Sequence, residues 1–406
     1  MTHPRYAALA CLCAFTVAAC GAGGTEPTPE VSGSPTEATH TASAGSSSAV
    51  PTTEATGASC VDSVAADLSP QQRLGQLLMI GFDTNAPQSA LDEYVRAEHV
   101  GNVIYLGGWE GLEKVRSTSE HLQSLVSPES TGGVGLVIAA DQEGGIVHQL
   151  RGDGFTRPPT ALEQARLTPA ELTGLAAQWG SQIASAGVNV NLAPVADTVP
   201  EEIGEANEPI GKWGRQFGSD PQVVGDYVVA FLDGMAQAEI TGVVKHFPGL
   251  GRVTGNTDFT AEGIEDTIAT VDDPFLLPFR AGMEGGAGMV MMSSARYPNI
   301  DPEHQAVYSS AVIADLLRER LGWEGVVITD DVNAAALASI PAGERAVRFL
   351  SAGGDIVLNG DPGATGEMLG AIRAEMDADP SFAERVEESV RRVLTLKDEM
   401  GLLPCS

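Results

Sequence analysis

Eight short apolar segments recur along the chain, with helical patterns between them. They span 77–82, 100–106, 134–140, 188–195, 243–247, 288–292, 325–329 and 355–358. Helix-start signals stand between them at Thr168-Pro169, Asp220-Pro221 and Asp273-Pro274. This alternation predicts one α/β catalytic domain, a parallel (β/α)8 TIM-like barrel. A doubly wound open sheet is the alternative, but no Gly-x-Gly-x-x-Gly follows the first segment, so a dinucleotide site is not indicated.

Polar residues stand where several of these apolar segments end. Asp141 follows the third segment, Asp330 follows the seventh, and the fifth contains Lys245 and His246 before a Pro-Gly turn. The carboxyl ends of barrel strands surround one pocket, where active sites of barrel enzymes lie. We therefore expect these side chains to face a common site.

Each of these residue types suits a sugar, and each has an ordinary structural alternative. Asp141 could accept two sugar hydroxyl groups, or it could cap a helix or turn. Asp330 could attack an anomeric carbon and form a covalent glycosyl-enzyme, or it could join Asp331 in binding a cation or capping a helix. Arg215 offers a planar fork of donors, and a surface salt bridge is its alternative.

Lys245 and His246 are neighbours in one predicted strand. Adjacent strand residues point to opposite faces, although both can reach a ligand where the strand twists into its loop. A lysine inside a strand needs a partner, because lysine is rarely buried alone. A lone histidine is more often structural, and we also favour a structural role for Asp197 after the fourth segment.

The N-terminus reads as a targeting segment. Arg5 precedes a short apolar run over residues 7–19, and Val17-Ala18-Ala19-Cys20 resembles the lipobox of bacterial lipoproteins. The resemblance implies a signal peptide over 1–19 and a lipid on Cys20. Residues 20–59, rich in Ser, Thr and Pro, are predicted to form a disordered tether. The barrel domain would span 60–406, outside the cytoplasm and anchored to the cell membrane.

The remaining cysteines suggest a disulfide. Cys11 and Cys13 would leave with the signal peptide and Cys20 would carry lipid, so Cys60 and Cys405 remain. Outside the cytoplasm we expect these two to pair, and two unpaired thiols is the alternative.

The acidic composition bears on partners. The 406 residues include 54 Asp and Glu but 23 Lys and Arg, a net charge of −31, which disfavours a nucleic-acid partner. There is no Cys-x-x-Cys, and the seven histidines show no ligand spacing, so we expect no metal and no cofactor. We expect a monomer.

Taken together, the motifs resemble those of glycoside hydrolase family 3, specifically its single-barrel β-N-acetylglucosaminidases, which include bacterial lipoproteins. Five segments in family order carry the resemblance: Asp141-Gln-Glu-Gly-Gly145, Asn189-Val-Asn-Leu-Ala-Pro194, Gly214-Arg-Gln-Phe-Gly218, Lys245-His-Phe-Pro-Gly249 and Val327-Ile-Thr-Asp-Asp331. The resemblance implies that Asp330 is the nucleophile. It also implies that a terminal sugar is bound by four residues, Asp141, Arg215, Lys245 and His246.

The chain departs from the family where those relatives carry their acid/base. They have an Asp-Ser-His in the loop after Lys-His-Phe-Pro-Gly, and this chain has Asn256-Thr257-Asp258. Leu250 also replaces a usual histidine, Ile146 a frequent arginine, and Ser294 a histidine after the sixth strand.

Two interpretations follow. In the first, Asp258 is the acid/base, since a carboxylic acid can protonate a leaving group in a dry site; Glu262 and Glu265 are the alternatives. In the second, the loop is catalytically impaired and the protein binds a sugar.

The sequence therefore predicts a retaining exo-β-N-acetylglucosaminidase that acts on peptidoglycan fragments, that is, on GlcNAc-containing muropeptides or disaccharides. A β-glucosidase-type exo-glycosidase and a sugar-binding lipoprotein without activity are the alternatives. A purely structural envelope protein would explain the lipobox and tether but not the polar strand ends.

Overall fold

A computed structural model describes residues 59–405. The predicted signal peptide, Cys20 and the tether up to residue 58 lie outside the described residues. The first helix, α1, begins at Cys60 and is capped by Ser59. Within 59–405, no helix combines the length and the apolar character needed to cross a membrane.

The predicted barrel is confirmed, since eight parallel strands follow one another around a sheet in chain order. These strands are β1 (Leu78–Asp83), β2 (Asn102–Leu106), β4 (Val137–Ala140), β8 (Val190–Asn191), β9 (Thr241–Phe247), β10 (Met289–Met292), β13 (Val326–Thr329) and β14 (Val357–Asn359). The first and last pair in parallel, Leu78 beside Val357. Contacts between β13 and β14 close the circle, with Ile328 bridging to Ile356 and the Thr329 N–H donating to the Ile356 carbonyl at 3.0 Å.

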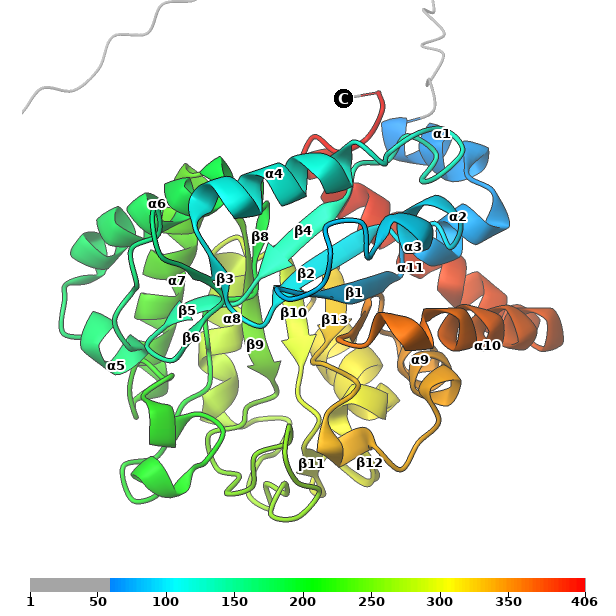
Figure 1. The fold of residues 1–406 in the computed structure, drawn as a ribbon. Coiled ribbons are helices and arrows are strands. Elements are labelled where there is room, and N and C mark those ends of the chain that lie inside the picture. The colour runs from blue at the N-terminus through cyan, green and yellow to red at the C-terminus, as the bar shows by residue number, and fades with distance from the viewer. Residues whose placement is uncertain (1–58, 406) are drawn as a thin grey trace, which may run out of the picture. The chain divides into compact units, whose positions relative to one another are not determined.

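Helices surround the barrel (Figure 1). They are α1 (Cys60–Asp67), α2 (Pro70–Gly75), α3 (Asp92–Arg96), α4 (Leu112–Gln123), α5 (Ala161–Gln164), α6 (Pro169–Ser185), α7 (Pro221–Gln237), α8 (Leu277–Glu284), α9 (Ala342–Ser351), α10 (Thr365–Ala378) and α11 (Pro380–Glu399), with η5 (Ala311–Arg320) between β10 and β13. The predicted starts are confirmed: Thr168 and Glu171 form a capping box on α6, and Asp220 caps α7. Asp273 caps the short helix η3 (Pro274–Leu276) that leads into α8.

Short strand pairs and short helices lie in the loops between the barrel strands and the main helices. Three two-stranded pairs are β3 (Trp109–Glu110) with β7 (Leu150–Arg151), β5 (Gln142–Gly144) with β6 (Val147–His148), and β11 (Arg296–Tyr297) with β12 (Asp301–Gln305). The remaining short helices are η1 (Gly204–Ala206), η2 (Gly211–Trp213), η4 (Ala306–Tyr308), η6 (Ala335–Leu337) and η7 (Pro362–Ala364). In Figure 1, β9 and β10 point toward the side that carries β11 and β12, and α1 lies at the opposite end.

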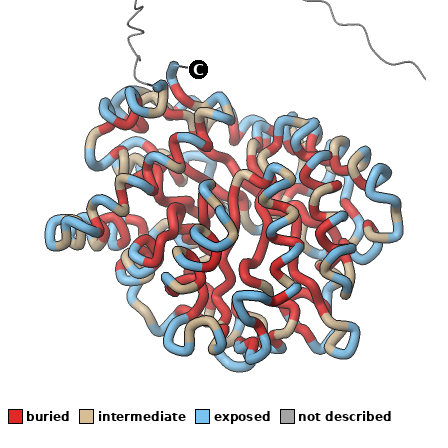
Figure 2. The backbone as a smooth tube through the Cα atoms, turned by 180° about the vertical axis from the view of Figure 1, so that it is seen from behind, coloured by how far each residue is buried: buried red, intermediate tan, exposed pale blue. Residues whose placement is uncertain are grey.

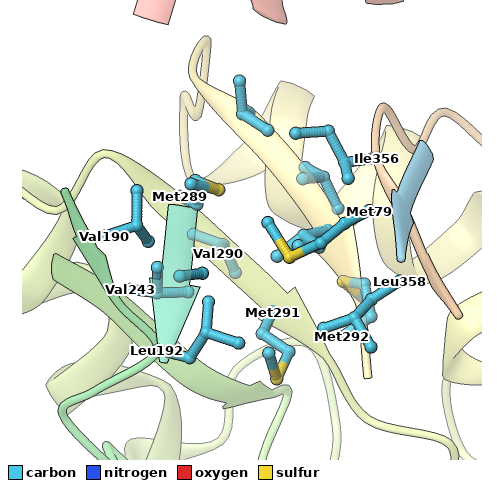
Figure 3. Close-up of a cluster of buried hydrophobic side chains, with 14 of the residues drawn as sticks. Met79, Val190, Leu192, Val243, Met289, Val290, Met291, Met292, Ile356 and Leu358 are labelled. Atoms are coloured by element: carbon cyan, nitrogen blue, oxygen red, sulfur yellow. The ribbon is translucent and has the colours of Figure 1, made fainter. Parts of the chain in front are cut away.

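The strands are apolar on both faces because both faces are covered. Every residue of β10 is buried, and Figure 3 shows its methionines among Met79, Val243 and Leu358 of other barrel strands. On the outer face, a Cβ at Gly282 of α8 would lie 2.4 Å from Val244, so only glycine lets this helix approach β9 so closely. Figure 2 shows the buried chain in the interior and the exposed chain in the outer turns.

One strand is much shorter than expected. We expected a strand over 188–195, but β8 covers only Val190–Asn191. Pro194 has no N–H to donate to a ladder, and the backbone returns to the sheet only at Val195, which bridges to Lys245 of β9.

The expected disulfide is confirmed between Cys60 and Cys405, whose Cα atoms lie 6.1 Å apart. It joins α1 to the segment after α11. That segment also pairs with the barrel, because the Gly135 N–H donates to the Leu402 carbonyl at 2.8 Å. The two ends of the domain are thus fixed together at the amino ends of the strands.

The double change Cys60→Ser with Cys405→Ser should lower the stability of the domain. The bridge closes a loop of 345 residues, and the chain-entropy account assigns such a constraint about 6 kcal/mol. The urea midpoint of the double variant should fall to that of the wild-type protein measured in reductant. An unchanged midpoint would show that the bridge contributes nothing to stability.

Candidate active site

The site residues proposed from the sequence gather at the carboxyl ends of the strands. Asp141 follows β4, Asp197 follows the short β8, and Asp330 follows β13. Lys245 and His246 directly precede Phe247, the last residue of β9, and a cis peptide bond joins them. Arg215 lies in the loop after η2 and contacts the same group.

Four side chains form one network of ion pairs. Lys245 Nζ lies 2.5 Å from Asp141 Oδ1 and 2.6 Å from Glu143 Oε1. Arg215 donates from Nε and Nη2 to the two oxygens of Glu143 at 2.8 and 2.7 Å, and from Nη1 to the Pro209 carbonyl at 2.8 Å. The expected partner of the strand lysine is therefore a pair of carboxylates.

The network is a preformed group of charges at the carboxyl ends of the strands. Burial alone would raise the pKa of Glu143, but Arg215 and Lys245 outweigh it and hold that pKa at about 2. Burial would likewise lower the pKa values of Lys245 and Arg215, yet the facing carboxylates raise both. Glu143, Lys245 and Arg215 are thus charged at neutral pH. Asp141 and Arg215 are the members that an incoming hydroxyl group can reach, since 19% and 15% of their side chains are exposed, against 6% for Glu143 and 2% for Lys245.

Glu143 was not among the site residues proposed from the sequence. Glu143 lies between Lys245 and Arg215 and contacts both. Its carboxylate accepts from Nε and Nη2 of Arg215, the donors that we expected to face a sugar. A signal was available, because Glu143 lies two residues after Asp141 and period-two alternation favours placing both on one side of the chain.

We expect Glu143→Gln to cost about 3–5 kcal/mol of unfolding free energy, because Arg215 and Lys245 would share one carboxylate in a buried site. The matched control is Glu208→Gln. Glu208 forms an exposed pair with Lys212 at 3.0 Å, and its loss should change stability by about 0.5 kcal/mol or less.

Urea unfolding at pH 7 measures both variants, and equal small effects would contradict a structural role for the buried network. The pKa of Glu143 is depressed in the folded state. Its contribution is therefore present above the ordinary glutamate pKa and is lost as pH falls toward 2.

His246 is oriented by a buried aspartate. The Asp197 Oδ2 atom accepts from His246 Nδ1 at 2.8 Å and from the His246 backbone N–H at 3.3 Å, and Oδ1 accepts from the Leu250 N–H at 2.6 Å. An ionised carboxylate only accepts, so the ring proton lies on Nδ1. Asp197 thereby fixes the imidazole and the start of the following loop, the structural role that we favoured for it.

Asp330 lies where these charges act on it. Burial raises the pKa of Asp330, and the negative charge of Asp258 raises it further, whereas the His246 side chain and the Asp331 N–H lower it. That N–H donates to Asp330 Oδ1 at 2.9 Å, and the Asp330 N–H donates to the Met292 carbonyl at 3.3 Å. The carboxylate therefore has one backbone donor and lies within the electrostatic reach of both the histidine and the loop aspartate.

The loop after β9 brings Asp258 close enough for its charge to act on Asp330. Arg252 fixes the base of the loop by donating to Asp273 at 2.5 and 3.0 Å and to Asp266 at 3.3 Å. The Arg252 guanidinium also lies 3.7 Å from the Phe275 ring centroid. The far end of the loop rests on η6, shortly after Asp330 in the chain.

Two backbone hydrogen bonds make this second contact. The Ala335 N–H donates to the Asp258 carbonyl at 3.2 Å, and the Ala336 N–H donates to the Thr257 carbonyl at 3.0 Å. The Asp258 side chain is exposed, and the Asp258 N–H donates to Asn256 Oδ1 at 3.0 Å. The loop and the segment that follows Asp330 are therefore joined directly.

The other departures from the family differ in burial. Ile146 is 48% exposed, whereas Leu250 is buried in the core. Ser294 is 1% exposed, and within the described chain its hydroxyl oxygen has no hydrogen-bond partner. Glu262 and Glu265, the alternative acids, are exposed in the same loop as Asp258. Among residues 59–405, no three His, Cys, Asp or Glu side chains are grouped so as to hold a metal ion.

The chain is similar to known glycosidases. Residues 70–396 match the model of the glycosyl hydrolase family 3 N terminal domain. The β-hexosaminidase LpqI of Mycobacterium tuberculosis is 31% identical over 411 residues, 98% of each chain. A β-hexosaminidase of Stenotrophomonas maltophilia is 36% identical over 247 residues, 58% of this chain and 70% of that protein.

Comparison with solved structures also finds similar glycosidases. The crystal structure of a β-N-acetylhexosaminidase from Beutenbergia cavernae superposes with a TM-score of 0.80 and 46% identity, covering 82% of this chain and 99% of that chain. Sequence, barrel and family model therefore lead to one conclusion: the chain belongs to glycosyl hydrolase family 3 and is a glycoside hydrolase.

Proposed function

We propose that this enzyme is a retaining exo-β-N-acetylglucosaminidase that removes terminal β-linked GlcNAc from peptidoglycan fragments. The observation that carries the proposal is the meeting of Asp330 with the Asp141–Lys245–Glu143–Arg215 network and the Asp258 loop at one end of the barrel. The relatives named as β-hexosaminidases support the choice of an acetamido sugar.

The reaction would proceed in two displacements. Asp330 attacks the anomeric carbon while Asp258 donates a proton to the leaving oxygen, which gives a covalent glycosyl-enzyme. Asp258 then takes a proton from water, and that water displaces Asp330. Asp141 accepts hydroxyl hydrogen bonds from the terminal sugar, and Lys245, Arg215 and His246 complete its pocket.

We further propose that the enzyme acts outside the cytoplasm, lipid-anchored to the cell membrane through Cys20. The disulfide between Cys60 and Cys405 supports an oxidising compartment, and the lipobox-like sequence supports the anchor. We also propose that the enzyme acts as a monomer.

The test is turnover of chitobiose and of an aryl β-N-acetylglucosaminide by purified residues 60–406, with the matching aryl β-glucoside as control. Release from both acetamido substrates, and a much slower reaction of the glucoside, is the expected result. Preference for the glucoside would identify a β-glucosidase. Binding of GlcNAc without turnover of any substrate would identify a sugar-binding protein.

A further inference from the structure

Phe259 is the most exposed of the large apolar side chains in residues 59–405, with 82% of its surface in contact with solvent. It directly follows Asp258. A single exposed apolar side chain is ordinary on a protein surface. What distinguishes Phe259 is that backbone hydrogen bonds hold the loop around it against η6.

The segment 254–263, called here the β9 loop tip, is closed by its own backbone. At its neck, the Gly255 and Thr254 N–H groups donate to the Gly263 carbonyl at 2.8 and 3.1 Å. Gly263 has φ of +70°, a conformation that favours glycine. Inside the tip, the Phe259 N–H donates to the Asn256 carbonyl at 3.0 Å. The backbone of Phe259 is therefore fixed relative to its neck.

The tip is also fixed relative to the nucleophile. The bonds from Ala335 and Ala336 to the carbonyls of Asp258 and Thr257 attach it to η6. The charge of Asp258 also contributes to the raised pKa of Asp330, as this attachment leads one to expect. Phe259 is consequently a preorganised aromatic surface at the edge of the reaction centre.

We propose that Phe259 forms one wall of an acceptor-side subsite, which binds the apolar face of the leaving pyranose ring. The inference rests on the proposed function, in which Asp258 protonates the glycosidic oxygen. A general acid must come within hydrogen-bond reach of that oxygen, so the residue next to it lies close to the departing sugar. The C–H face of a pyranose can cover an exposed aromatic ring and remove both from water.

Trp213, 41% exposed, is the other exposed large aromatic side chain within residues 59–405, and it fits this role less well. Lys212 Nζ lies 5.5 Å from its ring centroid, and its backbone adjoins Arg215 of the terminal-sugar network. A membrane surface is also a poor occupant for the loop tip, because Asp258 and Glu262 would be repelled by anionic headgroups.

The test compares two donors that differ only in the leaving group. Chitobiose loses a sugar ring, whereas N-acetyl-β-glucosaminyl fluoride loses a single atom. Phe259→Ala should lower kcat/KM for chitobiose about five- to tenfold and change it for the fluoride by less than about twofold. Phe259→Tyr keeps the aromatic face and should retain the wild-type ratio. Ile268→Ala, a change at another exposed apolar residue of the same loop, is the matched control and should alter neither substrate.

The outcomes separate this inference from the proposed function. Equal losses on both donors in Phe259→Ala would overturn the subsite, because the residue would then act on the terminal sugar or on folding. A chitobiose-specific loss in Trp213→Ala with none in Phe259→Ala would place the acceptor elsewhere and also overturn it. If the wild-type enzyme hydrolyses neither donor, the proposed function itself fails.

Discussion

Asp330→Asn is expected to abolish turnover while leaving the barrel folded. The nucleophile of a double displacement has no substitute, so kcat on every substrate should fall by a factor on the order of 10⁴ or more. Asparagine keeps the size of the side chain and an oxygen that can accept from the Asp331 N–H.

Stability should move in the opposite direction. Burial raises the pKa of Asp330, which means that the folded protein disfavours the ionised carboxyl at pH 7. A neutral side chain removes that unfavourable charge, so the melting temperature of Asp330→Asn should equal or exceed that of the wild type. Asp315→Asn, at an exposed aspartate of η5, is the control and should change neither property. Near-normal turnover by Asp330→Asn would rule out the nucleophile assignment.

The raised pKa also sets the expected pH dependence. Asp330 must be ionised to attack, so activity should be lost as pH falls through a value above the ordinary aspartate pKa. Because Asp258 contributes to that elevation, replacing it by asparagine should shift the acid limb to lower pH.

The barrel was predictable because its strands are buried on both faces and therefore read as uninterrupted apolar runs. Capping residues such as Thr168 and Asp220 were recognisable for a different reason, which is local. Their side chains accept from backbone N–H groups that lie two or three residues further along the chain. The length of β8 was overestimated, because an apolar run does not show where Pro194 interrupts the ladder.

The candidate site was predictable only in part. Carboxylates at strand ends are visible in sequence because apolar residues lead up to them, as with Asp141 and Asp330. The role of Glu143 depends on which cations pack against it. The sequence around Glu143 does not indicate that Arg215, from a distant loop, contacts it in the fold. The Asp258 loop is attached to η6 by backbone hydrogen bonds alone. Because every residue type has these backbone groups, the side chains in the sequence do not predict the attachment.

Asp258→Asn should separate substrates by the quality of their leaving groups. Loss of a positioned general acid typically costs about 10²–10⁴ in rate when the leaving group needs a proton, so hydrolysis of chitobiose should fall by that factor. An aryl glycoside with an acidic phenol needs little protonation, and its first step should be nearly unaffected. Steady-state rates on the two substrates, with Glu262→Gln and Glu265→Gln as matched controls in the same loop, measure the difference.

The second displacement gives an independent readout, because water must lose a proton to Asp258 as it attacks the glycosyl-enzyme. In Asp258→Asn the aryl substrate should therefore load the enzyme faster than water unloads it. Mass spectrometry of quenched protein should then find one sugar on the peptide that contains Asp330. Azide, an anion that needs no base, should restore turnover of the aryl substrate and form a β-glycosyl azide. Equal losses on both substrates, without azide rescue, would remove Asp258 from the acid/base role, and the same losses in Glu262→Gln or Glu265→Gln would transfer that role within the loop.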